Sequence, residues 1–245
     1  MAKFSIITIN YNNSIGLEKT MSSVFNQTFK DFEYIVIDGG SQDGSKELIE
    51  KNASRISKWI SEKDSGIYNA QNKGAKIATG EYCLFLNSGD YFADNLVLQK
   101  VSEAGLSEDF VYGDLLLENN HGQIEKAFSP DKLNVHHFMI STLWHPCTFI
   151  RREVFVKYGY YKENYKITAD YEFFIRTILK HKLKYKHLSL FVAVFNTGGI
   201  GSTDTNRKLQ EKEREQSWLE NYSPLTYSWF KFKTKLKRYK EAKLA

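Results

Sequence analysis

The sequence is poor in cysteine, with only Cys83 and Cys147 in 245 residues. Cys83 lies within an apolar run and Cys147 lies beside one. We therefore expect both to be small buried residues rather than part of a disulfide or a zinc site. Free cysteines are typical of proteins in a reducing compartment. No segment approaches the roughly 20 apolar residues of a membrane-spanning helix. The N-terminus enters an alternating strand directly, which argues against a signal peptide and predicts a cytoplasmic protein.

Most of the chain also lacks an excess of charge. The net charge is +5, and much of it lies between Lys231 and Lys243. The rest is close to neutral, which argues against nucleic acid as a partner. Apolar residues make up 42% of the chain, enough to bury a core. We predict a domain over residues 1–205 and a helical, basic C-terminal extension over residues 206–245.

Short apolar runs alternate with helical periodicity in the first half of the chain. Alternation of this kind predicts right-handed crossovers and an α/β fold with a mainly parallel sheet. Gly80 is expected to end the third helix in the usual C-terminal manner. The expected strands are 4–9, 32–37, 56–61 and 82–86, and the expected helices are 15–26, 45–52 and 67–79.

The second half is less regular. A strand is expected over 110–117, with a kink at Gly113, and a turn at 119–122 predicts an antiparallel return over 124–128. Ser223 and Pro224 interrupt a charged helical region that begins at Asn206. The other expected elements are strands at 147–150 and 188–195 and helices at 152–158 and 169–180.

Polar residues follow three of the early strands, at Asn10, Asp38 and 87–90. Ligands of open parallel sheets collect at the carboxyl ends of the strands, so we expect these residues to meet at one edge. An isolated aspartate after a strand is usually a turn or cap residue. With Asp38 and Asp43 nearby, Asp90 can instead hold Mg²⁺ or Mn²⁺, with a diphosphate supplying further oxygens.

The glycine-rich turn 38–44 matches neither the phosphate-binding P-loop nor the dinucleotide fingerprint. Asp38 could accept a hydrogen bond from a nucleobase or ribose, or belong to an ordinary turn. Asp64 and Ser65 are expected to cap the helix that follows. Its polar face, with Asn72 and Lys73, is either solvated or part of a nucleotide pocket.

The segment 168–172 begins another predicted helix. Asp170 and Glu172 either favour the helix dipole or include a catalytic base, and the sequence does not separate these interpretations. His145 precedes a strand, but no Cys/His spacing matches a zinc site. A serine hydrolase is also poorly supported, since no G-x-S-x-G elbow is present.

Five motifs then occur in a recognisable order: 8–12 (TINYN), 38–44 (DGGSQDG), 64–74 (DSGIYNAQNKG), 78–82 (ATGEY) and 85–90 (FLNSGD). Together they resemble the family 2 glycosyltransferases of the GT-A fold. The resemblance continues through 145–155, 159–161 and 169–176, so it covers roughly residues 3–202. An ordered set of this kind is far more specific than any single motif.

The resemblance implies an inverting transfer of a hexosyl or N-acetylhexosaminyl group from a nucleotide-diphosphate sugar, by default a UDP-sugar. The acceptor would be a lipid-linked or growing glycan in bacterial surface-polysaccharide biosynthesis. The implied roles are a general base at Asp170, a ligand to Mn²⁺ or Mg²⁺ at Asp90, nucleotide contacts at Thr8, Asn10, Asp38, Asp64, Asn72 and Lys73, and donor or acceptor contacts at Asn87, His145, Glu172 and Arg176.

The chain departs from the family pattern at the metal motif, where Asp90 is the only acid in 87–90. A donor diphosphate is then expected to complete the metal shell. The alternative is a non-catalytic nucleotide-sugar-binding module of the same fold. A nucleotidyltransferase is less well supported, because 8–13 contains neither glycine nor a cation. Residues 198–202 are expected to order over the donor.

The C-terminal segment 227–243 carries seven Lys/Arg and one Glu, with aromatic residues between them. Such a segment can lie on an anionic membrane surface, which would place the protein at the inner face of the cell membrane. It can equally be a solvated terminal helix. A homodimer is a further hypothesis about partners.

Overall fold

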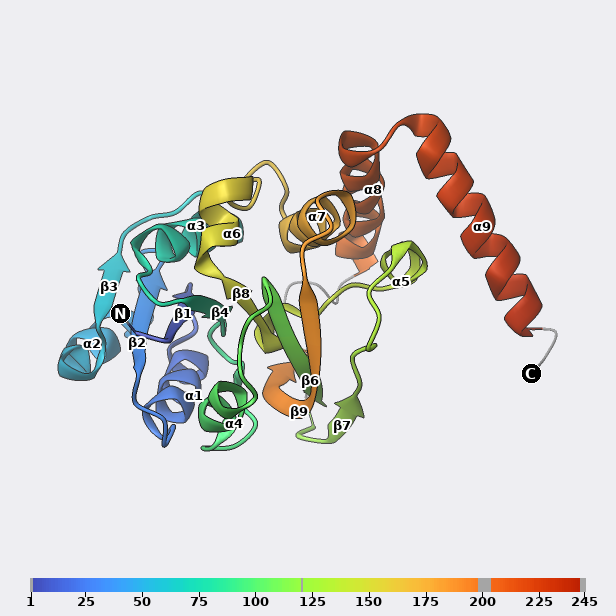
Figure 1. The fold of residues 1–245 in the computed structure, drawn as a ribbon. Helices are drawn as coiled ribbons and strands as arrows, with labels where there is room; N and C mark the ends of the chain where they lie inside the picture. The colour runs from blue at the N-terminus through green and yellow to red at the C-terminus, as the bar shows by residue number, and fades with distance from the viewer. Residues whose placement is uncertain (1, 120, 198–203, 243–245) are drawn as a thin grey trace.

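The computed structural model describes residues 2–119, 121–197 and 204–242. Within these residues a single nine-stranded sheet runs through the molecule in the order β3-β2-β1-β4-β8-β6-β9-β5, with β7 beside β6 (Figure 1). The strands are β1 (Phe4–Asn10), β2 (Phe32–Asp38), β3 (Lys58–Ser61), β4 (Tyr82–Phe85), β5 (Tyr91–Phe92), β6 (Phe110–Glu118), β7 (Ile124–Ala127), β8 (Thr148–Arg151) and β9 (Tyr185–Asn196).

The direction of the strands divides the sheet into two parts. β3, β2, β1 and β4 are parallel, as the alternation of strands and helices predicts. β8 then pairs antiparallel with both β4 and β6, and β9 returns parallel to β6. The register of β6 against β9 shifts around Gly113, where the sequence predicts a kink. The expected mixed, mainly parallel α/β sheet is therefore confirmed.

Helices cover both faces of the sheet (Figure 1). The helices are α1 (Ser14–Phe25), α2 (Ser45–Lys51), α3 (Ile67–Ile77), α4 (Val97–Glu103), α5 (Val135–Ile140), α6 (Arg152–Tyr158), α7 (Ala169–Phe174), α8 (Asp204–Asn221) and α9 (Pro224–Ala242). Alternate residues of β1 enter two different cores: Ile6 packs with α1, α2 and α4, and Ile7 with α3, α6 and α7. This period-two division is typical of a sheet buried on both sides.

The role predicted for Gly80 at the end of α3 is wrong. The helix ends at Ile77, Ala78 is already extended, and Gly80 is not among the residues with positive φ. Gly80 instead lies against β1, where an added Cβ would be 2.6 Å from Ser5 Oγ and 2.7 Å from the carbonyl carbon of Phe4. Glycine is needed here because the backbone of one segment touches that of another.

Several elements have no counterpart in the prediction. β5, α4 and α5 lie in segments where no element is expected from the sequence. The expected helix 169–180 exists, but its second half, Ile175–Lys180, is a π-helix. Within the described part of the chain, no helix is both long and apolar enough to cross a bilayer.

The C-terminal helix α8 packs on the sheet domain. Trp218 is 2% exposed and belongs to the same apolar core as Phe173 of α7. The indole N–H of Trp218 donates to the Tyr171 hydroxyl at 2.9 Å. The division predicted at residues 205 and 206 stays a prediction, and α8 shares an apolar core with residues before that boundary. α9 projects beyond α8 (Figure 1).

Candidate active site

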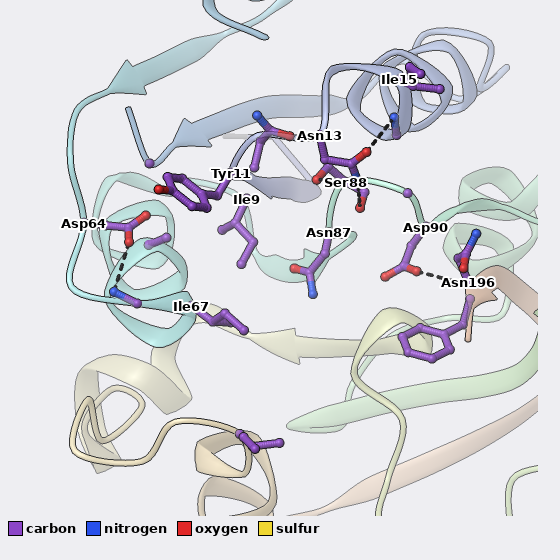
Figure 2. A pocket seen from close by; sticks show the side chains of 18 of the residues that line it. Ile9, Tyr11, Asn13, Ile15, Asp64, Ile67, Asn87, Ser88, Asp90 and Asn196 are labelled. Atoms are coloured by element: carbon purple, nitrogen blue, oxygen red, sulfur yellow. Dashed lines mark hydrogen bonds between the residues drawn. The ribbon is translucent and has the colours of Figure 1, made fainter. Parts of the chain in front are cut away.

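A cavity of about 1720 Å³ opens at the carboxyl ends of β1, β2 and β4. Figure 2 shows side chains from these strand ends, from the start of α1 and from the end of β9 around it. Adjacent strands place them there: Asn10 is in register with Asp38, and the Ser88 N–H donates to the Ile9 carbonyl at 3.0 Å. The predicted convergence of the three strand ends is confirmed.

Asp90 is the acidic side chain at the β4 side of this cavity. It is 5% exposed, and its carboxylate accepts one hydrogen bond from the Asn196 N–H at 3.2 Å. Burial raises the pKa of Asp90 to about 8, while the hydrogen bond from Asn196 opposes that rise. Figure 2 shows the carboxylate directed towards the cavity. This is a carboxylate whose charge a nearby cation would stabilise.

The residues around Asp90 fit a sparsely held divalent metal. Within the described residues, no three His, Cys, Asp or Glu side chains lie together as a metal cluster. Mg²⁺ is commonly held by one or two carboxylates together with substrate phosphates. Asp90 therefore fits as the one acidic ligand of Mn²⁺ or Mg²⁺, with a diphosphate required for the rest of the shell.

Thr20 of α1 holds the loop that carries Asp90, and the sequence gives no signal for this role. Its hydroxyl donates to the Asp90 carbonyl at 2.6 Å and accepts from the Gly89 N–H at 3.0 Å. Gly89 has φ of +105°, a conformation that favours glycine. Asn87, in the same loop, lines the cavity and accepts a hydrogen bond from Gln71 at 3.3 Å.

Asp38 lies just behind the cavity wall, in a network of protein donors. It is fully buried, and its carboxylate accepts hydrogen bonds from Asn10, from the hydroxyl and N–H of Ser41, and from Ser61. These bonds keep the pKa of Asp38 below its usual value although burial opposes this. Asn10 and Gly39 line the cavity in its place. In this structure Asp38 positions Asn10, and direct contact with a nucleotide would require its hydrogen bonds to rearrange.

Asp64 lines the opposite wall (Figure 2). It is not the helix cap that the sequence predicts, since α3 starts after Gly66, but it accepts the Gly66 N–H at 3.0 Å. A Cβ at Gly39 would be 2.6 Å from Asp64 Oδ2, so the glycine makes room for this carboxylate. Lys73 is not among the described lining residues, because its ammonium group pairs with Glu62 at 2.7 Å.

The side chains of Thr8 and Asn72 make hydrogen bonds within the protein and are not among the described residues that line the cavity. The Thr8 hydroxyl is fully buried and donates to the Leu86 carbonyl at 2.8 Å. Asn72 donates to the Tyr161 carbonyl and to Glu163, and accepts the Tyr161 N–H at 3.0 Å. Asn72, on the polar face of α3, thus binds the segment around Tyr161, and its contact with a nucleotide stays a prediction.

His145 is also part of the packed interior. Its ring stacks on Phe85 at 4.8 Å between centroids, and Nε2 lies 2.8 Å from the Tyr161 hydroxyl. Burial lowers the pKa of His145 to about 3, so the ring is neutral at physiological pH. The donor or acceptor contact expected of His145 from the sequence stays a prediction.

Glu172 and Arg176 belong to a buried ionic cluster. Glu172 is fully buried and accepts from Arg176 Nε at 3.1 Å, from Lys162 at 3.0 Å and from Asn221 at 3.1 Å. Arg176 also donates to the Tyr160 carbonyl at 3.0 Å. This cluster joins α7, α8 and the loop before α7, and the contact roles of both residues stay predictions.

Asp170, the predicted base, lies at the start of α7, three residues after the cavity residue Ile167. The Tyr68 hydroxyl lies 2.9 Å from Asp170 Oδ1 and 2.6 Å from the Ile167 carbonyl, and its single hydrogen is shared between these two acceptors. Burial raises the pKa of Asp170, and the hydrogen bond from Tyr68 lowers it. Lys166 and Ile167 line the cavity, but Asp170 is not among its described lining residues. Its catalytic role stays a prediction.

Glu213 of α8 is a further residue that the sequence did not point to. Its carboxylate accepts the N–H groups of Lys166, Ile167 and Thr168 and the Thr168 hydroxyl, at 2.7 to 3.1 Å. This buried side chain fixes the loop that carries the cavity residues Lys166 and Ile167. The predicted ordering of 198–202 over a donor lies outside the described residues.

Comparison with known proteins supplies the family. Residues 5–159 match the family model described as glycosyl transferase family 2. The chain belongs to this family. It is 31% identical over 217 residues, 85% of this chain and 83% of the relative, to a PGL/p-HBAD biosynthesis glycosyltransferase of Mycobacterium bovis. The expected family membership and fold class are confirmed.

Other family relatives and solved structures are similar over smaller shares of their own length. A GalNAc(5)-diNAcBac-PP-undecaprenol beta-1,3-glucosyltransferase of Campylobacter jejuni is 32% identical over 53% of this chain and 43% of its own length. S. aureus TarS 1–349 in complex with UDP-GlcNAc has a TM-score of 0.67 at 18% identity, over 84% of this chain and 64% of that chain. The mannosyltransferase PcManGT of Pyrobaculum calidifontis, with GDP-Man and Mn²⁺, has a TM-score of 0.61 at 14% identity, over 79% and 56%.

Proposed function

We propose that this family 2 glycosyltransferase moves a hexosyl or N-acetylhexosaminyl group from a UDP-sugar to an acceptor hydroxyl, with inversion at the anomeric carbon. The observation that carries the proposal is Asp90, a buried carboxylate directed into a large cavity where three parallel strands end. A desolvated carboxylate at such an edge suits a cation and a diphosphate.

The acceptor we propose is a lipid-linked or growing glycan of cell-surface polysaccharide or glycolipid biosynthesis. The names of two relatives support it: the mycobacterial one is named for PGL/p-HBAD biosynthesis, and the Campylobacter one for the substrate GalNAc(5)-diNAcBac-PP-undecaprenol. The fold neighbours were solved with UDP-GlcNAc and with GDP-Man, so the nucleotide base needs a direct test.

Asp90 would hold Mn²⁺ or Mg²⁺, and the metal ion would stabilise the negative charge that develops on the leaving diphosphate. Asp170 would take the proton of the acceptor hydroxyl as the acceptor oxygen bonds to the anomeric carbon and the bond to the diphosphate oxygen breaks. Its raised pKa makes it a stronger base than a solvated aspartate. Asn10, Asp64 and Asn87 would position the donor, with Asp38 behind Asn10.

A panel of UDP-, GDP- and dTDP-sugars, each with Mn²⁺ or Mg²⁺, tests this proposal by thermal shift and by donor hydrolysis. NMR of the product's anomeric configuration tests inversion. We expect Asp90→Asn to abolish metal-dependent turnover, and Asp170→Asn to keep donor binding while losing transfer. The matched control is Asp31→Asn, an exposed aspartate beside the amino end of β2.

Two results would contradict the proposal. Full metal-dependent activity in Asp90→Asn would remove Asp90 from the site. Donor binding without turnover in the unaltered chain, across acceptors, would instead identify a nucleotide-sugar-binding module.

A further inference from the structure

The last helix, α9, has one face packed on the protein. Tyr227 stacks on Trp218 at 6.2 Å between centroids, and Phe230 contacts Trp218 at 5.7 Å and Tyr222 at 5.4 Å. Thr234, one turn further, is also buried. These contacts fix the rotation of α9 about its own axis, so its opposite face is defined.

That opposite face is a stripe of large apolar side chains, here called the outer stripe. Its members follow a regular spacing of four, three, four and three residues: Leu225, Trp229, Phe232, Leu236 and Tyr239, which are 85, 52, 60, 44 and 59% exposed. At about 100° of rotation per residue, they lie within about 40° of one line along the helix. Tyr227, Phe230 and Thr234 lie roughly opposite. Leu225, Trp229, Phe232 and Leu236 therefore face away from the packed side of α9 and stay 44 to 85% exposed.

Lysines border the outer stripe. Lys233 and Lys235 are exposed and lie about 80° to either side of its centre line. The Lys233 ammonium group is 4.7 Å from the centre of the Trp229 ring. The sequence of α9 has further basic residues at 237, 238 and 240 and one acid, at 241. An apolar stripe between rows of cations is the arrangement of helices that lie in a membrane interface.

We infer that the outer stripe of α9 binds the surface of a bilayer that contains anionic lipid. The apolar side chains would enter the boundary between headgroups and acyl chains, and Lys233 and Lys235 would reach the lipid phosphates. A second copy of this chain is the other candidate for an apolar stripe of this spacing. Symmetric pairing would bring the lysine rows of two copies together, so charge favours the anionic surface.

The inference does not depend on the sugar donor or acceptor, and a binding experiment on the full chain tests it. We expect the protein to sediment with vesicles of mixed phosphatidylcholine and phosphatidylglycerol and not with vesicles of phosphatidylcholine alone. Binding should weaken as salt is added, because the attraction is partly between exposed charges. Equal binding to both kinds of vesicle would overturn the inference.

Two pairs of variants separate the apolar and the charged contribution. Trp229→Ser with Phe232→Ser should lower partitioning at least about tenfold, whereas Ile124→Ser with Val156→Ser, two exposed residues elsewhere, should not. Lys233→Glu with Lys235→Glu should lower it to a similar or greater extent, unlike Lys51→Glu with Lys132→Glu. Circular dichroism and thermal melts confirm that all four variants fold. Wild-type partitioning in either α9 variant would overturn the inference.

The fluorescence of Trp229 provides a second measurement of membrane binding. Its emission should shift to shorter wavelength on addition of anionic vesicles, and Trp229→Phe should bind while losing that shift. Sedimentation velocity without lipid tests the second copy as the occupant. A dimer that Trp229→Ser with Phe232→Ser dissociates would assign the outer stripe to self-association and overturn the membrane assignment.

Discussion

The carboxylate of Asp90 accepts a hydrogen bond from the backbone N–H of Asn196, 106 residues later in the chain, at 3.2 Å. Asp90 immediately precedes β5 and Asn196 ends β9, and these two strands pair antiparallel through Tyr91 and Val194. The last strand of the sheet therefore holds the proposed metal ligand in place, although β4 brings it to the cavity.

The raised pKa of Asp90 predicts how stability depends on pH in the metal-free protein. In the unfolded chain this carboxyl titrates near 3.8, and in the folded chain near 8. Between these pH values the folded state keeps a proton that the unfolded state has released, so the free energy of unfolding falls as pH rises. Above about pH 8 both states have released the proton, and the loss of stability is complete. Asp90→Asn should remove this decline, which can reach several kcal/mol, about 1.4 per pKa unit. Thermal melts between about pH 4 and pH 9 measure it.

The same melts contain their own controls. Asp31→Asn should keep the wild-type slope. Mn²⁺ with a nucleoside diphosphate should raise the wild-type melting temperature most at alkaline pH, and raise that of Asp90→Asn much less. If the melting temperatures of wild type and Asp90→Asn changed with pH in the same way, the pKa of Asp90 would not be raised by folding.

Tyr68→Phe tests the role of Asp170. Removing the hydroxyl removes a hydrogen bond to the carboxylate, so the pKa of Asp170 should rise and the acidic limb of the kcat profile should move to higher pH. The loss in kcat should be about tenfold, as for a hydrogen bond to a charged group. Tyr112→Phe, whose hydroxyl donates to the remote Pro130 carbonyl, should leave the profile unchanged. An unshifted acidic limb in Tyr68→Phe would separate Asp170 from catalysis.

Glu213→Gln tests the link between α8 and the cavity. A Gln side chain would turn an amide NH₂ towards N–H donors, so the unfolding free energy should drop by about 1–3 kcal/mol. Because Glu213 holds the loop of Lys166 and Ile167, KM for the donor should rise by more than kcat falls. Glu211→Gln, at an exposed position of the same helix, is the control for urea melts and kinetics. A KM that stays constant would limit Glu213 to a role in stability.

Gly80→Ala should destabilise the fold more than Gly105→Ala. A Cβ at Gly80 meets the backbone of β1, and the strain should cost about 1–3 kcal/mol or more. Gly105 has φ of +68° with nothing within 4 Å of the added atom, so only its backbone conformation opposes alanine, at about 1–2 kcal/mol. Urea unfolding of both variants measures the order. Equal stability would show that the α3–β4 connection can move away from β1.

The local sequence pattern was sufficient to predict those elements whose own residues show a clear periodicity or an apolar run. Apolar runs such as that of β1 predicted buried parallel strands, and the position of Asp38 and Asp90 after strands predicted the edge where the cavity lies. The parallel return of β9 beside β6 depends on contacts between segments far apart in the chain, and periodicity does not report these.

Side-chain roles were less predictable than positions. Asp38 is satisfied by Ser61 from the neighbouring strand, and Glu172 by Asn221 from α8, so both are occupied by partners that a sequence pattern cannot reveal. Glu213 has the appearance of a solvated glutamate on a charged helix, yet it is 5% exposed. Burial of a polar group becomes visible only when the tertiary partners are known.

The packing of α8 also sets where the chain can be shortened or fused. Cutting at residue 205 would remove Trp218 from a core it shares with α7, leave Glu172 without Asn221, and free the N–H groups that Glu213 binds. A cut after Ser223 would leave all three in place and remove α9, and it would expose the surface that Tyr227 and Phe230 cover. Protein engineering of this enzyme should therefore treat α8 as part of the catalytic body and α9 as the exchangeable module.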